Sequence, residues 1–192
     1  YGYFNGGNKL KSNYDSSGII YGFRDGSSSS TVYNYDLNGN MTRDLNKGVN
    51  AISYNYLNLP TNVSVTSGSS GTIQYVYDAN GVKQKKIVTQ GGSYTVTDYA
   101  GNYIYENNSL QFYSTPEGYF KRTGISSGKI LGQYVYQYKD HLENIRLSYS
   151  DANNNGSITA SSEIIEENNY YPFGLTHKGY NGNVSSNGNS VA

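Results

Sequence analysis

The sequence predicts an all-β protein, a ribbon of antiparallel hairpins that forms a curled sheet. No segment of useful length shows helical periodicity. Gly and Asn recur at short intervals, and β-branched and aromatic residues fill the stretches between them. A unit of alternating tyrosines followed by a turn sequence also returns at a regular spacing, which is typical of proteins built from stacked repeats.

The clearest copy of this unit is Tyr33–Asn40, a short strand that runs into a tight turn. Its two tyrosines alternate with Asn34, so both rings lie on one face of an extended chain. Asn38-Gly39 supplies two successive residues that tolerate positive φ. The dipeptide therefore predicts a type I′ hairpin turn.

The unit returns at Tyr75–Gly81, and a degenerate copy lies at Tyr54–Pro60. The tyrosine pairs begin at residues 33, 54 and 75, so they are spaced 21 residues apart. A period of about 20 residues suits two strands and two turns. One such unit cannot bury its apolar face, so we expect stacked units to form a continuous sheet with two open edges.

Strands are predicted wherever aromatic and β-branched residues gather between turn signals. In chain order they cover residues 31–35, 51–56, 62–66, 72–77, 82–89, 93–99, 102–105, 110–113, 119–124, 129–138 and 144–150. The turns between them are marked by Asn38-Gly39, Ser67–Gly71, Asn80-Gly81, Gly91-Gly92, Gly101-Asn102, Pro116–Gly118 and Leu142–Asn144. Residues 1–32 are less regular, with a degenerate copy of the unit at Tyr14–Ile19. The regular recurrence of tyrosines on one face favours a structural inner layer.

Tyrosine limits what kind of core the chain can build. Of 192 residues, 23 are Tyr and 35% are hydrophobic, while Trp and Cys are absent. A buried tyrosine ring needs a partner for its hydroxyl, so we expect a sheet with one wet face or edge. With 14 basic and 14 acidic residues, binding to nucleic acid or to anionic membranes is not expected. The lack of Cys excludes disulfides and zinc–thiolate sites.

The pattern Tyr-x-Tyr-Asp-x-Asn-Gly-Asn resembles the YD-repeat of bacterial Rhs proteins, toxin-complex shell proteins and animal teneurins. Residues 33–40 match it fully, and residues 75–81 match most of it. Two later stretches, Tyr136–Tyr149 and Glu166–Gly174, resemble the start of the Rhs repeat-associated core domain. The family usually has Gly at the position of Glu143, so we expect a positive-φ turn there to be strained or rebuilt. The resemblance covers about residues 14 to 180.

The resemblance implies three parts: YD/Rhs repeats at residues 1–132, the start of the core region at 133–180 and a polar tail at 181–192. Because the chain starts at Tyr1 and has no signal peptide or bilayer-spanning run, we expect a fragment of a longer polypeptide. In the family, such repeats wind into a hollow shell that commonly encloses a C-terminal toxin. The resemblance therefore implies an all-β spiral of antiparallel YD-repeat hairpins that forms part of a curled sheet or shell. No Asp-Pro occurs in this chain, so the family's self-cleavage is not assigned to it.

The function implied by the resemblance is structural: a shell segment of a secreted bacterial Rhs-type polymorphic toxin that encapsulates and delivers an effector. The implied partners are the flanking polypeptide, the effector and secretion-machinery proteins, without nucleic acid or membrane insertion. The alternative is a cell-surface adhesin or glycan-binding YD-repeat protein. No catalytic, cofactor-binding or metal-binding residue is predicted. The structural residues of the repeats are Tyr33, Tyr35, Asp36, Gly39, Tyr54, Tyr56, Tyr75, Tyr77, Asp78, Gly81, Tyr136, Tyr138, Asp140, Asn144, Arg146, Tyr171, Pro172 and Gly174.

Two polar stretches have a chemical interpretation beside the structural one. His141 lies between Asp140 and Glu143, which suggests an acid–base or metal pair. No nucleophile or third ligand lies at a recognisable spacing, so we interpret the stretch as a turn. Residues 151–158 resemble the first half of a calcium loop, but the twelfth position is Ser162 and not Glu, so we favour a polar hairpin loop between Ser148 and Glu163, with calcium binding as the alternative.

Two further features have similar alternatives. Glu163, Glu166 and Glu167 are interpreted as a solvated strand edge and not as a glycosidase pair, which must flank one bond. The tyrosine-rich face has the ring chemistry to stack on sugars, although its regularity favours a structural role. His177 is interpreted as a surface residue.

Overall fold

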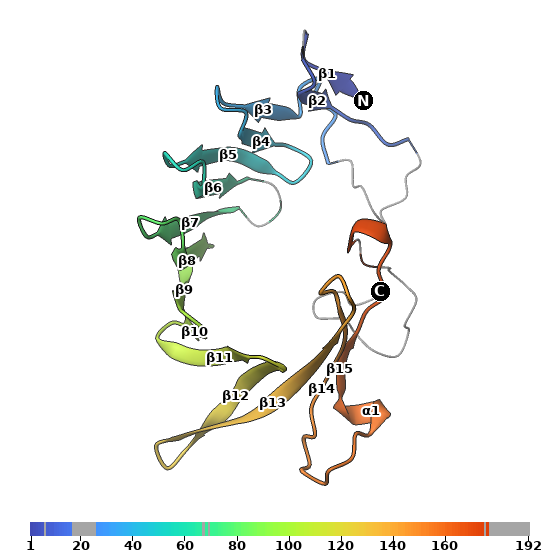
Figure 1. Cartoon of the computed structure of the whole chain (residues 1–192). Helices are drawn as coiled ribbons and strands as arrows, with labels where there is room; N and C mark the ends of the chain where they lie inside the picture. Colours follow the sequence, from blue (N-terminus) through green and yellow to red (C-terminus); the bar gives the residue numbers. More distant parts are fainter. Residues whose placement is uncertain (6, 17–25, 67, 69, 175, 177–192) are drawn as a thin grey trace. The chain divides into compact units, whose positions relative to one another are not determined.

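The structure is a computed structural model that describes residues 1–5, 7–16, 26–66, 68, 70–174 and 176. It confirms the predicted all-β fold of antiparallel hairpins (Figure 1). Two strands near the N-terminus, β1 (Gly2–Tyr3) and β2 (Leu10–Ser12), form a small antiparallel sheet. The other 13 strands form one sheet in which each strand lies beside the next strand of the sequence, from β3 to β15.

The described chain divides into two compact units, and the first comprises residues 1–100 and 106–108. Its strands in the large sheet are β3 (Tyr33–Tyr35), β4 (Met41–Asp44), β5 (Val49–Tyr54), β6 (Pro60–Val65), β7 (Gly71–Tyr77), β8 (Lys83–Gln90) and β9 (Ser93–Ala100). The turns of the β3–β4, β5–β6 and β7–β8 hairpins emerge at the same end of the strands (left in Figure 1). Alternate turns of the chain therefore become neighbours in space.

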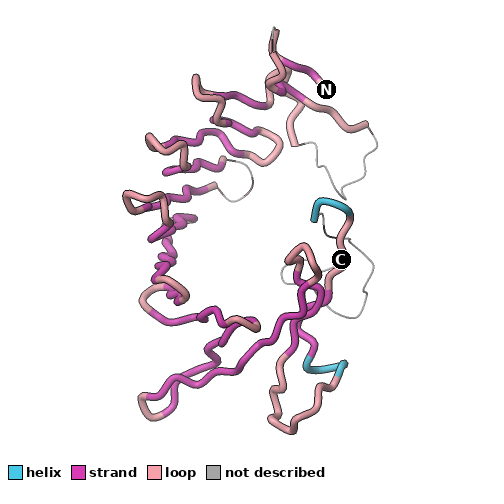
Figure 2. Tube along the Cα trace, viewed as in Figure 1, coloured by secondary structure: helices cyan, strands magenta, loops and turns pink. Residues whose placement is uncertain are grey.

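The second unit comprises residues 101–105 and the chain from residue 109 onward. Its strands are β10 (Tyr103–Glu106), β11 (Ser109–Thr115), β12 (Gly118–Ser126), β13 (Lys129–Lys139), β14 (Ile145–Tyr149) and β15 (Ile164–Glu167). The helix α1 (Ala160–Glu163) precedes β15, and the 3-10 turn η1 (Pro172–Gly174) follows it (Figure 2). In the described residues, neither helical segment has the length and hydropathy needed to cross a membrane.

All the predicted strands overlap observed strands, but the structure adds three that the sequence pattern did not reveal: β1, β2 and β4. It also forms β15 where Glu166 and Glu167 were interpreted as part of a strand edge. The strand β4 has the sequence Met-Thr-Arg-Asp, with one apolar residue, and so lacks the alternation by which strands are recognised. Its partners on both sides supply the backbone hydrogen bonds that hold it extended. The predicted features at residues 17–19, 67, 69, 177 and 181–192 lie outside the described residues.

The second unit shows which face of its sheet is covered. Val135 on β13 is 1% exposed, whereas Tyr134, Tyr136 and Tyr138 on the same strand are 51%, 38% and 67% exposed. Ser148 is 1% exposed and is the register partner of Gln137, on the Val135 side. On β13 the tyrosine face is therefore the more exposed one, and its role as a structural inner layer stays a prediction.

Candidate functional site

One turn geometry recurs at four places and organises the candidate site. At Asp36, the backbone N–H donates to the carbonyl of Asn40 at 2.9 Å, and the Asp36 carbonyl accepts the N–H of Gly39 at 3.2 Å. The same two bonds, between 2.9 and 3.1 Å, recur in the turns that begin at Asn55, Asp78 and Asp140. We call these four the Asx turns, since each begins at an Asp or Asn.

Only the third loop residue of each Asx turn has positive φ. These residues are Gly39 (90°), Asn58 (58°), Gly81 (84°) and Glu143 (64°). A register shift next to each turn accompanies this geometry. One positive φ and one shift define a type I turn with a G1 bulge. The type I′ turn predicted at Asn38-Gly39 is therefore wrong. In the described residues, successive positive φ values occur instead at Gly91-Gly92, Asn107-Asn108, Ser127-Gly128 and Phe173-Gly174.

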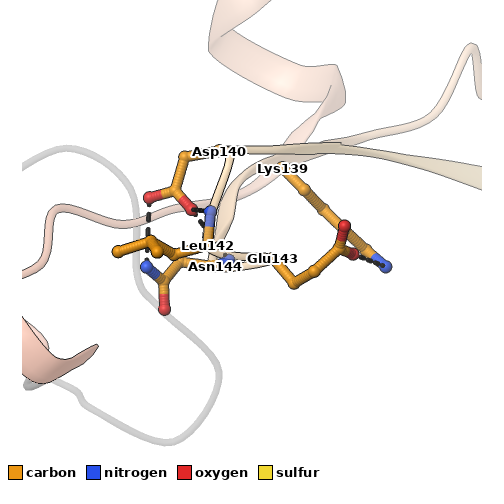
Figure 3. A network of polar contacts seen from close by, with 5 residues as sticks. All are labelled: Lys139, Asp140, Leu142, Glu143 and Asn144. Carbon is orange, nitrogen blue, oxygen red and sulfur yellow. Dashed lines mark hydrogen bonds and ion pairs between the residues drawn. The ribbon is translucent and has the colours of Figure 1, made fainter.

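The side chain of the first residue determines this choice of turn. Oδ1 of Asp140 accepts the N–H groups of Leu142 at 2.9 Å and Asn144 at 3.0 Å, and Oδ2 accepts Nδ2 of Asn144 at 3.1 Å (Figure 3). Oδ1 of Asp78 accepts the N–H groups of Asn80 and Val82, both at 2.9 Å. Bonds of this kind hold the first loop residues in right-handed conformations, because the acceptor faces the N–H groups of the following turn.

The degenerate copy of the repeat keeps the turn because Asn55 replaces Asp. Its Oδ1 accepts the N–H groups of Leu57 at 2.9 Å and Leu59 at 3.0 Å. The turn residues 36, 55 and 78 lie 19 and 23 residues apart, so the uniform spacing of 21 does not describe the turns. Tyr54 precedes its turn, while Tyr56 lies inside it and is 82% exposed. Asn55, read as a substitute for Asp, is the signal that places this turn correctly.

Hydrogen bonds set the protonation of two of these carboxylates. The side-chain bond from Asn40 lowers the pKa of Asp36 below its usual value. At Asp140, burial favours the neutral acid, but the bonds from Asn144 and Leu142 outweigh it and lower the pKa. Both carboxylates are therefore ionised acceptors near neutral pH.

The turn at Asp140 carries the residues that suggested chemistry. His141 is its first loop residue, and Glu143 is the third, where positive φ is normal for Gly. The expected positive φ at Glu143 is confirmed, and the turn keeps the hydrogen bonds of the other three. The Glu143 carboxylate pairs with Nζ of Lys139 at 3.2 Å (Figure 3). The hydrogen bonds of Asp140 run to Asn144 and to the backbone of its own turn.

Tyrosine hydroxyls connect three Asx turns to a later part of the chain. Tyr54 donates to the carbonyl of Met41 at 2.6 Å, and Tyr77 donates to that of Pro60 at 3.0 Å. Tyr170 donates to the carbonyl of Ile145 at 2.9 Å. Each acceptor is the fifth residue after the Asp or Asn that begins its turn. Burial raises the pKa of all three tyrosines, so their hydroxyls stay protonated as donors.

Neighbouring turns of the first unit also touch directly. Oδ1 of Asn58 accepts Nδ2 of Asn38 at 3.0 Å and Nδ2 of Asn40 at 2.8 Å. In the next turn, a Cβ at Gly81 would lie 3.1 Å from Cδ1 of Leu59. The stacking of turns thus relies on side-chain amides at one contact and on the absence of a side chain at the other.

In the second unit, the two stretches that resemble the Rhs core domain, residues 136–149 and 166–174, contact each other. Tyr170 reaches Ile145 through its hydroxyl, and a Cβ at Gly174 would lie 3.6 Å from Oδ1 of Asn144. The guanidinium of Arg146 donates to Oδ1 of Asn169 at 2.6 Å and lies 5.8 Å from the ring of Tyr170. Tyr170 was absent from the predicted set, which named its neighbours Tyr171, Pro172 and Gly174. The last two lie in η1, whose Gly174 N–H donates to the carbonyl of Tyr171 at 3.1 Å.

The other predicted tyrosines contact aromatic or polar neighbours. Tyr33 is buried, and its hydroxyl donates to Oδ1 of Asn13 at 2.8 Å. The ring centroids of Tyr75 and Tyr77 lie 6.3 Å apart. In the second unit Tyr136 stacks on Tyr149 at 5.7 Å, while a separate row passes through Tyr103, Tyr113, Phe120 and Tyr134 at 5.0 to 5.3 Å. Tyr35 makes an edge contact with Phe4 at 6.4 Å.

The loop before β15 is organised by a buried carboxylate. Glu163 is 3% exposed, and its oxygens accept the N–H groups of Ala152 at 3.0 Å, Asn153 at 3.3 Å and Thr159 at 2.8 Å. The prediction of a solvated edge is therefore wrong for Glu163, because three backbone donors compensate its burial. Asp151 accepts the N–H groups of Asn155 and Gly156. Calcium binding by this loop stays the alternative to a polar loop.

No family model and no curated protein matches the chain. Among solved structures, the chain is similar to the crystal structure of TcdB2-TccC3-TEV, with a TM-score of 0.49 and 19% identity over 74% of this chain. It is also similar to a Tc holotoxin pore of Photorhabdus luminescens with a mutation in TccC3, with a TM-score of 0.49 and 18% identity over 74% of this chain. The chain spans 7% of the length of each matched chain.

Proposed function

We propose that this chain is a structural segment of a secreted bacterial Rhs-type polymorphic toxin. Its hairpins form part of the wall of a shell that encloses and delivers a C-terminal effector. The observation that carries this proposal is the recurrence of the Asx turn at the positions by which the sequence resembles the YD-repeat, including Asp36, Asp78 and Asp140. The motif residues are occupied in building the sheet: Asp accepts N–H groups, Gly adopts positive φ and Tyr donates to a neighbouring hairpin.

The proposed partners are the flanking parts of the same polypeptide, the enclosed effector and secretion-machinery proteins. The edge strands β3 and β15 support the first of these, because an edge strand offers unpaired backbone groups to a further strand. The proposed location is outside the bacterial cell or on its surface. We also propose that the chain has no catalytic role. If alanine at His141 or Glu143 abolished an activity while the fold survived, this part of the proposal would be wrong.

Protection of the effector tests the proposed function. The complete polypeptide encoded by the gene is treated with protease and compared with the effector region expressed alone. We expect the effector region to survive in the complete polypeptide and to be digested when expressed alone. Equal digestion in both samples would contradict a shell.

A glycan-binding surface is the alternative, and one observation favours it. Tyr134, Tyr136 and Tyr138 lie on the more exposed face of β13, where rings are accessible to a sugar. A glycan array probed with the intact protein separates the two functions. Saturable binding that is lost in Tyr138→Ala would favour the adhesin, while the shell model expects no such binding.

A further inference from the structure

Three Asn-Gly pairs lie in the described residues, at positions 38–39, 80–81 and 155–156. Asn followed by Gly is the pair most prone to spontaneous deamidation, because no Cβ hinders attack by the glycine nitrogen on the asparagine side chain. In a folded protein, the reaction also requires both groups to leave their native contacts. The hydrogen bonds of the asparagine side chain and of the glycine N–H differ among the three pairs.

The pairs at 38–39 and 80–81 form a matched comparison. Both lie at the same positions of an Asx turn, with φ of 90° at Gly39 and 84° at Gly81. Both glycine N–H groups donate to the first carbonyl of the turn, at 3.2 Å and 3.1 Å. The backbone therefore restrains the two nucleophilic nitrogens equally.

The asparagine side chains differ. Nδ2 of Asn38 donates to Oδ1 of Asn58 in the neighbouring turn at 3.0 Å. Asn80 is exposed, and in the described part of the chain its amide side chain has no hydrogen-bond partner. The Asn38 amide must break a contact before its Cγ can meet the glycine nitrogen, whereas the Asn80 amide is free to rotate.

In the third pair, Asn155-Gly156, a hydrogen bond to a charged carboxylate restrains the glycine nitrogen. The N–H of Gly156 donates to the Asp151 carboxylate at 2.8 Å, and Oδ1 of Asn155 accepts the N–H of Ser157 at 2.8 Å. A hydrogen bond to a carboxylate is stronger than one to a neutral carbonyl, so the nucleophilic nitrogen is held more firmly here than in the Asx turns.

We propose that Asn80 is a modification site of the native protein and the first of the three residues to deamidate. The Gly81 nitrogen loses its proton and forms a bond to Cγ of Asn80. The bond from Cγ to Nδ2 then breaks, and ammonia leaves with the proton. Water opens the resulting succinimide at either carbonyl, which yields Asp or isoaspartate at position 80.

The product alters the turn that contains it. The new carboxylate lies two residues after Asp78, whose Oδ1 accepts the N–H of residue 80. Isoaspartate also adds a backbone methylene to a three-residue loop, which moves Gly81 out of reach of the Asp78 carbonyl. We therefore expect modification to loosen the end of the β7–β8 hairpin.

The test is peptide mapping by mass spectrometry after incubation of the whole chain in warm, mildly alkaline buffer. We expect position 80 to gain the acid form several-fold faster than positions 38 and 155. In denaturant, where the contacts are absent, we expect similar rates at 38 and 80. Faster reaction at 38 or 155 in the native protein would overturn the proposal, as would the same preference for 80 in denaturant.

A matched variant tests the protecting contact. Asn58→Gly keeps the positive φ of the turn and removes the acceptor for Asn38. We expect the native rate at position 38 to rise toward that at position 80, with the rate at 80 unchanged. An unchanged rate at 38 would show that the contact between the two amides is not the cause.

Discussion

The hydroxyl of Tyr77, at the end of β7, donates to the carbonyl of Pro60 in the preceding β5–β6 hairpin. Tyr54 bears the same relationship to Met41. In both cases the tyrosine directly precedes an Asx turn, and the acceptor follows the previous one. A hydrogen bond therefore connects the end of a strand in one hairpin to the residue that follows the turn of the hairpin before it. The chain has few aliphatic residues. Tyrosine supplies both an apolar ring and a hydroxyl, and the hydrogen bonds of these hydroxyls hold neighbouring repeats in register.

Replacing Tyr77 with Phe tests this connection. The ring remains, while the carbonyl of Pro60 loses its donor. We expect the free energy of unfolding to fall by about 1 kcal/mol, the usual net value of one hydrogen bond. Urea unfolding followed by circular dichroism measures the change.

Tyr56→Phe is the matched control, because Tyr56 is 82% exposed in the turn between β5 and β6. We expect no measurable change in stability. If both variants lost the same stability, a general property of tyrosine and not the bond to Pro60 would be responsible.

Glu143→Gly removes strain from the Asp140 turn. A side chain at a positive φ costs about 1 to 2 kcal/mol, and the exposed ion pair with Lys139 contributes little. We expect the variant to be more stable by about 1 kcal/mol, because glycine also loses more backbone entropy on folding. Glu143→Gln, which keeps the strain and removes the charge, should behave as the natural protein does. A destabilised Gly variant would contradict this account of the turn.

Stability should decrease in acid through Asp36 and Asp140. Both have a folded pKa below the unfolded value of about 3.9. The unfolded chain therefore binds protons more readily, so this contribution is complete above the unfolded pKa and is lost as pH falls through the folded pKa. Unfolding measured across this range in Asp36→Asn and Asp140→Asn should show a weaker pH dependence than in the natural protein. Asn55 shows that an amide can hold the same turn. An unchanged pH dependence would assign the acid sensitivity to other carboxylates.

Glu163→Gln tests the buried carboxylate of the second unit. A neutral amide accepts with one oxygen only, so at least one of the N–H groups of Ala152, Asn153 and Thr159 loses its acceptor. We expect faster hydrogen exchange at residues 151–159 and unchanged exchange in β7 and β8. Glu167→Gln on β15 is the control. Unchanged exchange at residues 151–159 in Glu163→Gln would show that the carboxylate does not organise the loop.

Most strands and the turns at Asn38-Gly39 and Asn80-Gly81 were predictable from the sequence, because alternation and Asn-Gly pairs are local signals. The strand β4, with its single apolar residue, was not. The turn type was not, since Asn-Gly is compatible with two geometries and the Asp36 side chain decides between them. The bond from Tyr170 to Ile145 connects residues 25 apart, and no periodicity predicts such a contact. The burial of Glu163 was missed for the same reason: its three donors lie up to 11 residues away in an irregular loop.

Electron cryomicroscopy of the complete polypeptide encoded by the gene tests the central claim most directly. The account predicts that β3 to β15 form consecutive strands of a wall around an enclosed effector, with the hydroxyls of Tyr54, Tyr77 and Tyr170 on their carbonyl acceptors. A structure in which these strands project as a free surface array, with no enclosed chain, would contradict it.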